Sequence, residues 1–243
     1  MKWAFLIVFF KLAIAQAPAF VDTWVAWNIG QGQWVTHVTS DVCRHFDVGG
    51  EPGTYRRIKR RFLIACGHKK NEILLSHWDF DHFFNIPSLA RSVPSACWLY
   101  QPSYGGTKAQ AQKILSLKIP PCVPDPNLAH WFPAAARNTN ESSAVFAEQG
   151  VLLPGDSPIT QEKIWANQLR AVSTAKVLIL GHHGSRTSTG RELLSLLPDV
   201  LFSVSSARYV RYRHPHIDTV MRLMEFRIPL LKTEDWGNIW FTP

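Results

Sequence analysis

A chain of 243 residues with 46% hydrophobic and 18% charged residues can bury one sizeable core, and this composition excludes an intrinsically disordered protein. No period of about 20 to 50 residues repeats along the chain, which excludes solenoids and propellers. The 26 Lys and Arg residues outnumber the 18 Asp and Glu residues, and the net charge of +8 weakly favours a polyanionic partner.

The N-terminal residues have the pattern of a secretory signal. Lys2 precedes an apolar run over residues 3–15 that only Lys11 interrupts, and small residues follow up to Ala19. The run is shorter than the roughly 20 residues that cross a bilayer. We therefore expect a signal peptide over residues 1–19 and an exported domain over residues 20–243 with no transmembrane segment; an uncleaved, membrane-tethered form is the alternative. Cleavage leaves 24 basic against 18 acidic side chains, a net charge of +6.

The first part of the domain predicts strands that lead into a polar segment. Alternating apolar and polar residues predict strands at 23–28 and 34–38, joined by a turn at Gly30-Gln31-Gly32, and a third strand at 44–48. Helical spacing predicts an amphipathic helix at 54–66 whose polar face is crowded with basic residues. A short apolar strand at 72–75 follows.

The rest of the chain alternates strands with helices. The patterns first predict a helix at 83–93, a strand at 96–100, a helix at 107–117 and an irregular Pro-rich stretch at 120–133. They next predict strands at 143–148 and 151–153, a helix capped by Ser157-Pro158 and a strand at 177–180. A helix at 190–197, a strand at 200–204, a helix at 217–226 and strands near 229–232 and 238–241 complete the chain. This order predicts an α/β fold with two mixed sheets flanked by helices.

The segment directly after the strand at 72–75 carries four metal-ligand side chains within six residues, His77, Asp79, Asp81 and His82. A loop that leaves a strand can direct such groups to adjacent points, whereas a helix or a strand cannot. Imidazole suits zinc, and carboxylate suits manganese or magnesium, so we expect one or two Zn or Mn ions. The alternative is a solvated acidic turn, which the preceding apolar strand disfavours.

Two further strand ends carry candidate ligands. Asp156 follows the strand at 151–153, where its carboxylate can bridge two ions, although an Asp near a helix start is also a common cap. His182 and His183 follow the strand at 177–180 in a polar turn flanked by glycines, which favours a functional role over burial in the core.

Three weaker candidates have simpler explanations. His214 follows a basic and aromatic run at 208–213, which either tracks phosphates or is a solvated loop. Asp47 fits a turn aspartate equally well. Ser185 lies beside His183, but no third group orients a Ser-His-Asp triad, and a serine hydrolase is therefore discounted.

Together these groups suit the attack of a metal-bound hydroxide on an ester-like centre, with Asp81, Asp156 and His183 as the catalytic residues. No separate side-chain nucleophile is required.

Four cysteines occur in a chain that we expect to be exported, so two disulfides are plausible. No CxxC spacing occurs, which gives no support to a zinc knuckle or a thioredoxin-like redox pair. Three pairings are possible, and we favour Cys43 with Cys66 and Cys97 with Cys122.

The ordered motifs resemble the metallo-β-lactamase-like domain at the C-terminus of ComEC-type DNA-uptake proteins. The similar segments extend from Trp27 to Trp240 and are, in chain order, Gly30 to Gln33, Asp47 to Gly49, Ser76 to His82, Asn140 to Val145, Leu153 to Asp156, His182 to Ser185, His214-Pro215 and Thr233 to Ile239. A single motif of this kind is nonspecific, whereas the ordered series over most of the chain is a strong signal.

The resemblance implies an αββα sandwich with the metal site along one edge of the facing sheets. It also implies nuclease-like activity on DNA in the bacterial periplasm or outside the cell. By position, the metal ligands would be His77, Asp79, Asp81, His82, Asp156 and His182, and the substrate contacts would be Asn140, His183, Ser185 and His214.

This chain departs from the family at three places. Gln33 stands where the family has an aspartate, and Asn85-Ile86-Pro87 replaces a glycine-rich start. We also expect no multi-span channel of the kind that precedes the domain in the family. We therefore expect a free-standing form that degrades external DNA or assists a separate membrane DNA-uptake channel.

Two alternatives to a DNase stay open. One is a metallo-hydrolase of a small ester, lactone or β-lactam, which an enclosed apolar pocket would favour over a basic groove. The other is a non-catalytic periplasmic DNA-binding or competence accessory protein, which the complete ligand set disfavours.

Overall fold

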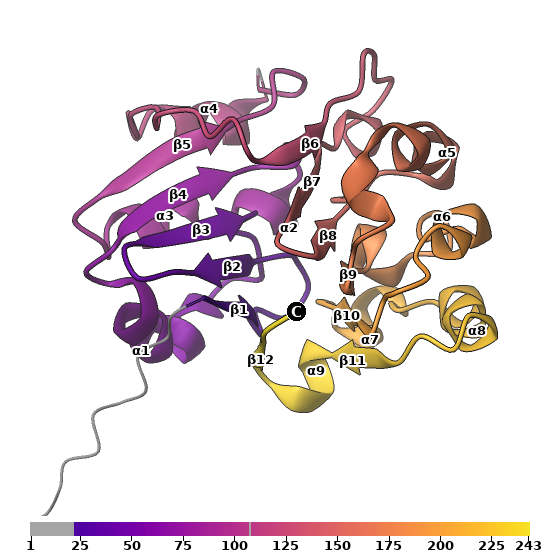
Figure 1. Ribbon diagram of the computed structural model, residues 1–243. Helices are drawn as coiled ribbons and strands as arrows, with labels where there is room; N and C mark the ends of the chain where they lie inside the picture. The colour runs from indigo at the N-terminus through magenta and orange to yellow at the C-terminus, as the bar shows by residue number, and fades with distance from the viewer. Residues whose placement is uncertain (1–21, 107) are drawn as a thin grey trace, which may run out of the picture.

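The computed structural model describes residues 22–106 and 108–243, so the expected signal peptide and the domain boundary at residue 20 lie outside the described residues. Two six-stranded sheets face each other, and helices cover their outer sides (Figure 1). The first sheet contains β1 (Thr23–Ala26), β2 (Val35–Val38), β3 (Val42–Phe46), β4 (Lys70–Leu74), β5 (Ala96–Tyr100) and β12 (Ile239–Phe241). The second contains β6 (Ala129–Trp131), β7 (Val145–Glu148), β8 (Val151–Leu153), β9 (Val177–Ile179), β10 (Phe202–Ser205) and β11 (Leu230–Lys232).

Both sheets are mixed, as the sequence predicts. The strand order is β12-β1-β2-β3-β4-β5 in the first sheet and β11-β10-β9-β8-β7-β6 in the second. Strands β3, β4 and β5 run parallel to one another, and so do β8, β9, β10 and β11, while the remaining neighbours are antiparallel. Loops that follow parallel strands leave from the same edge of a sheet, and this edge collects the polar residues described below.

Helices flank both sheets. The first sheet is accompanied by α1 (Tyr55–Cys66), α2 (Phe80–Phe83), α3 (Ile86–Ala90) and α4 (Ala109–Leu115). The second is accompanied by α5 (Ile159–Gln168), α6 (Arg191–Ser195), α7 (Tyr209–Tyr212), α8 (Ile217–Glu225) and α9 (Thr233–Trp236). Three short 3₁₀ helices, η1 (Asn140–Ser142), η2 (Arg170–Val172) and η3 (Gly181–Gly184), lie in the loops. The αββα class predicted from the sequence is therefore confirmed.

The alternation of side chains along a strand explains why the fold has a core on each side of each sheet. In and just after β1, Trp24 and Ala26 belong to the core between the two sheets, whereas Val25 and Trp27 belong to the core between the first sheet and its helices. A third core, which includes Trp165, lies between the second sheet and its helices. All five side chains are fully buried.

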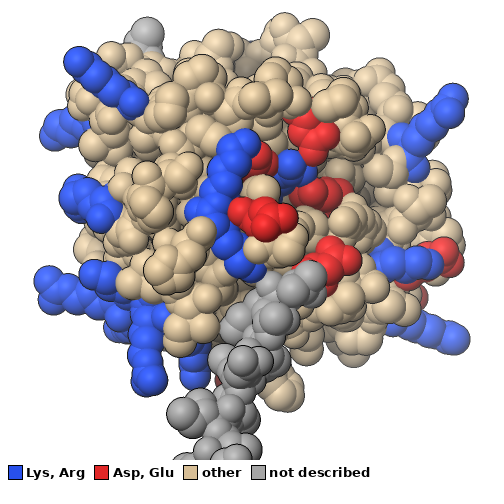
Figure 2. Space-filling model, turned by 60° about the vertical axis from the view of Figure 1, so that its left-hand side comes forward, with Lys and Arg blue, Asp and Glu red and all other residues tan. Residues whose placement is uncertain are grey.

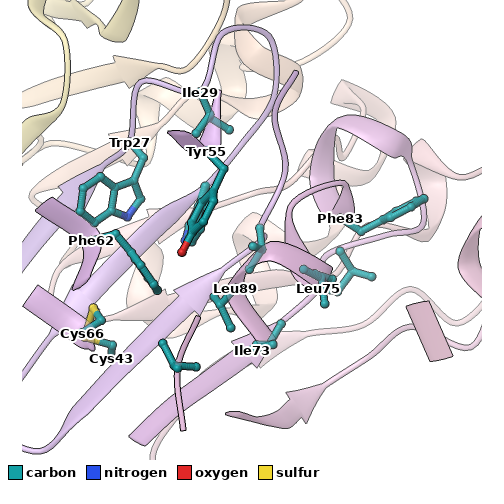
Figure 3. Packing of buried hydrophobic residues seen from close by; sticks show 14 of the residues in the cluster. Trp27, Ile29, Cys43, Tyr55, Phe62, Cys66, Ile73, Leu75, Phe83 and Leu89 are labelled. Atoms are coloured by element: carbon teal, nitrogen blue, oxygen red, sulfur yellow. A yellow bond between two sulfur atoms is a disulfide. The ribbon is translucent and has the colours of Figure 1, made fainter. Parts of the chain in front are cut away.

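Two disulfides join elements of the first half of the chain. Cys43 of β3 bonds Cys66 at the end of α1, beside the packed rings of Tyr55 and Phe62 (Figure 3). The second disulfide joins Cys97 and Cys122. Both predicted pairings are confirmed, and two disulfides are consistent with an oxidising compartment.

Two expectations about local structure were wrong. The Pro-rich stretch at 120–133 contains β6, which pairs antiparallel with β7 and so gains its structure from a long-range partner. The helix expected at 83–93 begins earlier and is divided into α2 and α3, with Pro87 in the first turn of α3, where its missing N–H costs nothing. Among the described residues, no helix is long and apolar enough to span a membrane.

Candidate metal centre

The candidate centre lies where strands of both sheets end. His77 follows β4 of the first sheet, Asp156 follows β8 of the second, and His182 and His183 follow β9. The structure thus brings together three stretches, the first and last of which are 101 residues apart in the chain at His82 and His183. Each sheet supplies one side of the centre.

The stretch after β4 divides between a loop and a helix. His77 and Asp79 lie in extended loop backbone, whereas Asp81 and His82 lie in the single turn of α2. The expectation of one loop for all four residues was therefore only half right. The change of backbone conformation after Asp79 directs the two aspartates to different partners. Asp79 Oδ2 lies 3.5 Å from His77 Nε2, whereas Asp81 Oδ2 lies 3.2 Å from His183 Nε2.

Asp156 occupies the middle of the centre and is only 3% exposed. Its Oδ2 atom lies 3.6 Å from His77 Nε2 and 3.5 Å from His182 Nε2. Its Oδ1 atom lies 3.1 Å from His82 Nε2 and 3.9 Å from His183 Nε2. The two oxygens of one carboxylate therefore face two different pairs of imidazoles. Asp156 is not the residue that caps α5, since Pro158 has that position.

Ligand atoms converge in two sets that could each hold an ion. The Nε2 atoms of His77 and His82 and an Asp156 oxygen lie within 4.8 Å of one another, and Asp81, His82 and His183 form a second such set. These are nitrogen and carboxylate donors, which suit zinc or manganese.

Partners outside the centre orient three of the imidazoles. His82 Nδ1 lies 2.8 Å from Asp47 Oδ2, His183 Nδ1 lies 3.1 Å from the carbonyl oxygen of Ser206, and His77 Nδ1 lies 3.0 Å from Ser76 Oγ. An Nδ1–H that donates to an oxygen leaves the Nε2 lone pair free to bind an ion. All three Nε2 atoms are directed to the centre.

Asp47 is a buried partner of the centre, which the sequence left undecided. Its carboxylate accepts hydrogen bonds from the Ser76 backbone N–H at 2.7 Å, from Ser76 Oγ at 2.9 Å and from Gln33 Nε2 at 2.9 Å, in addition to its contact with His82. The Gln33 amide can donate to this carboxylate. An ionised aspartate at position 33 would instead repel it.

Two glycines of the predicted motifs are required by close backbone packing. A Cβ atom at Gly49 would lie 1.6 Å from the carbonyl oxygen of Asp81, and one at Gly32 would lie 2.5 Å from the same atom. The Asp81 carbonyl also accepts hydrogen bonds from the backbone N–H groups of Gln33 and Gly50. The glycines thus let two loops hold the first turn of α2 directly.

The charges and the unsatisfied atoms of the centre fit a cation. Among the described residues, the buried atoms His77 Nε2 and Asp156 Oδ1 have no hydrogen-bond partner. Burial opposes ionisation of Asp156, but the charges of His82 and His182 hold the pKa of its carboxyl well below the ordinary value. Burial also disfavours charge on His82, yet Asp156 and Asp47 raise its pKa well above the ordinary value. The buried carboxylates are therefore stabilised by nearby positive charge. A divalent ion can supply this charge in place of the protons on the imidazoles.

The residues expected to contact substrate take different positions. His183 is 2% exposed, and its Nε2 atom lies 3.2 Å from His82 Nε2, so the geometry favours it as a ligand. Asn140 Nδ2 lies 3.4 Å from His182 Nδ1, and the His214 ring centroid lies 5.8 Å from that of His182. Both residues border the centre. The hydroxyl of Ser185 instead bonds Thr187 Oγ1 at 3.0 Å.

Sequence reasoning missed several contacts of the centre. Thr139 Oγ1 donates to Asp79 Oδ2 at 3.0 Å, and Lys108 Nζ lies 3.6 Å from Asp79 Oδ1. Ser206 contributes a backbone carbonyl, which no residue-type pattern can reveal. Ser76, by contrast, stands inside the predicted motif, and its position between His77 and Asp47 could have been suspected.

The chain is similar to competence proteins over most of its length. It is 31% identical over 208 residues to ComE operon protein 3 of Bacillus subtilis. The aligned region covers 74% of this chain and 26% of that protein. It is also 24% identical over 223 residues to competence protein ComA of Neisseria gonorrhoeae. This second aligned region covers 88% of this chain and 31% of that protein. The chain thus spans less than a third of either relative. No protein-family model matches it.

Solved structures share the fold at low sequence identity. The metallo-β-lactamase fold protein YhfI from Bacillus subtilis superposes with a TM-score of 0.58 at 11% identity, covering 90% of this chain and 98% of that one. Igni18, a metallo hydrolase from Ignicoccus hospitalis, superposes with a TM-score of 0.53 at 13% identity over the same shares.

The chain has the metallo-β-lactamase fold, and its His/Asp cluster is of a kind that can hold metal ions. Within that class, the chain is related to the competence proteins of the ComEC and ComA type and is much shorter than they are.

Proposed function

We propose that the protein is a metal-dependent nuclease or phosphodiesterase that acts on DNA. The observation that carries this proposal is the Asp156 carboxylate, whose two oxygens face different imidazole pairs. A carboxylate shared in this way suits two neighbouring ions, and paired ions suit phosphodiester cleavage because they stabilise charge on both the attacking and the leaving oxygen.

We assign the imidazoles by the Asp156 oxygen that each of them faces, which places His82 with His183 although it also lies near His77. We assign His77, Asp79 and His182 to one ion, Asp81, His82 and His183 to the other, and Asp156 to both. When bound, zinc or manganese ions would lower the pKa of water and stabilise negative charge on the substrate. The assignment of His183 as a ligand rather than a substrate contact is a change from the sequence prediction.

The protein's own residues would hold the substrate and the ligands in place. Asn140 and His214 border His182 and are proposed to contact the substrate. Asp47 is proposed to keep the Nε2 atom of His82 directed inward through its contact with Nδ1. Ser185 is no longer proposed as a contact, because its hydroxyl is directed to Thr187.

The relationship to competence proteins supports DNA as the substrate. It also supports export to the periplasm or the cell exterior and association with a separate DNA-uptake channel, both of which stay proposals. The net positive charge of the chain is compatible with DNA binding. The basic side chains are, however, unevenly distributed over the surface. On the face drawn in Figure 2, Lys and Arg side chains lie around the periphery, and near the middle acidic side chains gather beside further basic ones.

The test combines metal analysis with a cleavage assay. The purified protein is loaded with manganese or zinc, its metal content is measured by elemental analysis, and it is incubated with single- and double-stranded DNA. We expect about two ions per chain and cleavage with at least one of the metals. The variant Asp81→Ala should lose cleavage while keeping its fold. Confirmed occupancy without any cleavage would contradict the proposal.

A further inference from the structure

Two pockets lie side by side next to the Asp81 side of the candidate centre. The first, called here the aromatic pocket, has a volume of about 260 Å³ and is lined by Phe80, Asp81, Arg211 and Tyr212 among others. Asp81 lines this pocket and also contacts His183, so the pocket borders the candidate centre at Asp81.

The aromatic pocket has two exposed rings and a cation in its wall. Phe80 is 42% exposed and Tyr212 is 53% exposed, so both side chains are partly accessible to solvent. The Arg211 guanidinium lies 5.3 Å from the Tyr212 ring centroid, and its Nη1 atom lies 3.0 Å from Glu51 Oε1. The ion pair holds Arg211 in place beside the ring.

The second pocket, called here the basic pocket, has a volume of about 410 Å³ and is lined by Arg56, Lys59 and Arg91 together with Phe84. No acidic side chain lines it. Within residues 22–106 and 108–243, these three cations form no ion pair, although other arginines of the chain do. The basic pocket therefore presents uncompensated positive charge to solvent, which suits phosphate groups.

The two pockets adjoin each other. The ring of Phe80 in the aromatic pocket lies 4.5 Å from the ring of Phe84 in the basic pocket, centroid to centroid. One loop also borders both pockets, because Pro52 lines the aromatic pocket and Gly53 lines the basic one. The lining residues thus run from the three cations, past two phenylalanines, to Asp81, and this run of residues is called here the path.

We propose that this path binds single-stranded nucleic acid and delivers it to the candidate centre. Phosphates contact Arg56, Lys59 and Arg91, and unpaired bases stack on Phe80 and Tyr212. Sequence-tolerant binding of single strands combines a basic groove with exposed aromatic rings, since every base has a stacking face. A duplex offers the phosphates but not the base faces. The inference rests on the proposed function and names the form of its substrate.

Binding is tested separately from cleavage. The anisotropy of a fluorescein-labelled oligothymidylate and of a matched blunt duplex is measured with the full chain in chelator, so that no strand is cut. We expect tighter binding of the single strand. Arg56→Ala should weaken it several-fold and reduce the slope of log affinity against log salt by about 0.7, as expected for one lost phosphate contact on a single strand. Tyr212→Ala should weaken it roughly tenfold.

Matched controls remove the same chemistry outside the path. Arg60 is exposed on the same helix as Arg56 but does not line the basic pocket, and Trp236 is an aromatic residue that is 70% exposed on α9. Arg60→Ala and Trp236→Ala should leave single-strand affinity unchanged. Equal losses in Arg56→Ala and Arg60→Ala would overturn the path, as would equal or tighter binding of the duplex.

Failure of the path and failure of the proposed function give different results. Hydrolysis of bis(p-nitrophenyl) phosphate by the metal-loaded wild type tests the centre without the path. If this diester is cleaved but single-strand affinity does not depend on Arg56 and Tyr212, the path is overturned and the proposed function stands. If binding depends on both residues but no diester is cleaved, the path is supported and the proposed function fails.

Discussion

The two halves of the molecule hold their parts of the centre by different means. In the first half, two disulfides link β3 to α1 and β5 to the following loop, and glycine-bearing loops bind the backbone of α2 directly. No cysteine follows Cys122. In the second half, His182, His183 and Thr189 have positive φ angles of 49°, 56° and 57°, which cost energy for residues other than glycine.

A buried polar network stabilises this strained loop. The Glu162 carboxylate accepts hydrogen bonds from the backbone N–H groups of Thr189 and Gly190, and Arg222 donates to the carbonyl oxygens of Ser188 and Arg186. Covalent links and backbone packing thus hold one side of the centre, whereas the buried Glu162 carboxyl and the Arg222 guanidinium hold the other. The comparison predicts that the halves fail under different treatments.

The largest effect is expected where the halves meet. Asp156→Ala removes the carboxylate that faces imidazoles of both sides. Loss of a residue that only hydrogen-bonds to a metal ligand typically lowers metal affinity or activity by about 10- to 100-fold. Loss of Asp156, which we assign as a ligand, should therefore lower hydrolysis by more than about 100-fold and reduce the bound metal. Cleavage rate and elemental analysis measure both effects. Asp199→Ala, a change at a surface ion pair, is the control. Wild-type metal content in Asp156→Ala would contradict the shared-ligand assignment.

The next effect is expected in the first half. Removal of the disulfide by Cys43→Ala with Cys66→Ala should lower the free energy of unfolding by about 3 kcal/mol, because the bond closes a loop of 23 residues. Denaturant unfolding measures this loss. Hydrogen exchange of residues 181–190 should change little under native conditions. Early exchange of that loop in the variant would show that the halves are not held independently.

A smaller effect is expected in the second half. In Glu162→Gln an amide N–H₂ must face the backbone N–H of Thr189 or Gly190, so a hydrogen bond is replaced by opposed donors. The free energy of unfolding should fall by about 2 kcal/mol, and residues 181–190 should exchange faster than in the wild type. Glu192→Gln, at an exposed glutamate, is the control. A uniform loss of protection in both halves would contradict a local role.

The smallest effect concerns pH and the first half. Burial lowers the pKa of His45 from 6.5 to about 4, against the hydrogen bond that His45 Nε2 donates to Asn71 Oδ1 and the charge of Glu72. The unfolded chain then binds the proton more readily, so this contribution to stability is complete above about pH 6.5 and falls as the pH drops towards 4. Between about pH 7.5 and pH 5 the loss should be about 1–2 kcal/mol.

Denaturant unfolding of the metal-free protein at both pH values measures this loss. In His45→Gln the difference between the two pH values should shrink by the same amount, whatever the starting stability of the variant. An unchanged difference would assign the acid sensitivity to other groups.

Much of the fold follows from local patterns. The amphipathic spacing at 54–66 predicted α1 to within one residue, and the apolar strands before His77, Asp156 and His182 were found where alternation and apolar runs predicted them. β6 escaped prediction because it is short, lies among prolines and exists only through pairing with β7. The division of the expected helix at 83–93 escaped because the start of α2 depends on contacts of the Asp81 carbonyl with two distant loops.

The sequence by itself determined which residue types follow which strands, since side-chain alternation and motif spacing are properties of a few neighbouring residues. It thereby pointed to six candidate ligands, whereas it left three disulfide pairings possible and only favoured the one that the structure has. Only the tertiary structure decided that Asp156 lies between two sets of imidazoles, that His183 joins one of them and that Asp47 orients His82. Distances between loops of different sheets depend on register and on the packing of one sheet against the other, and no local pattern encodes them. The path from Arg56 to Asp81 has the same origin, because its walls come from α1, α2 and the distant α7.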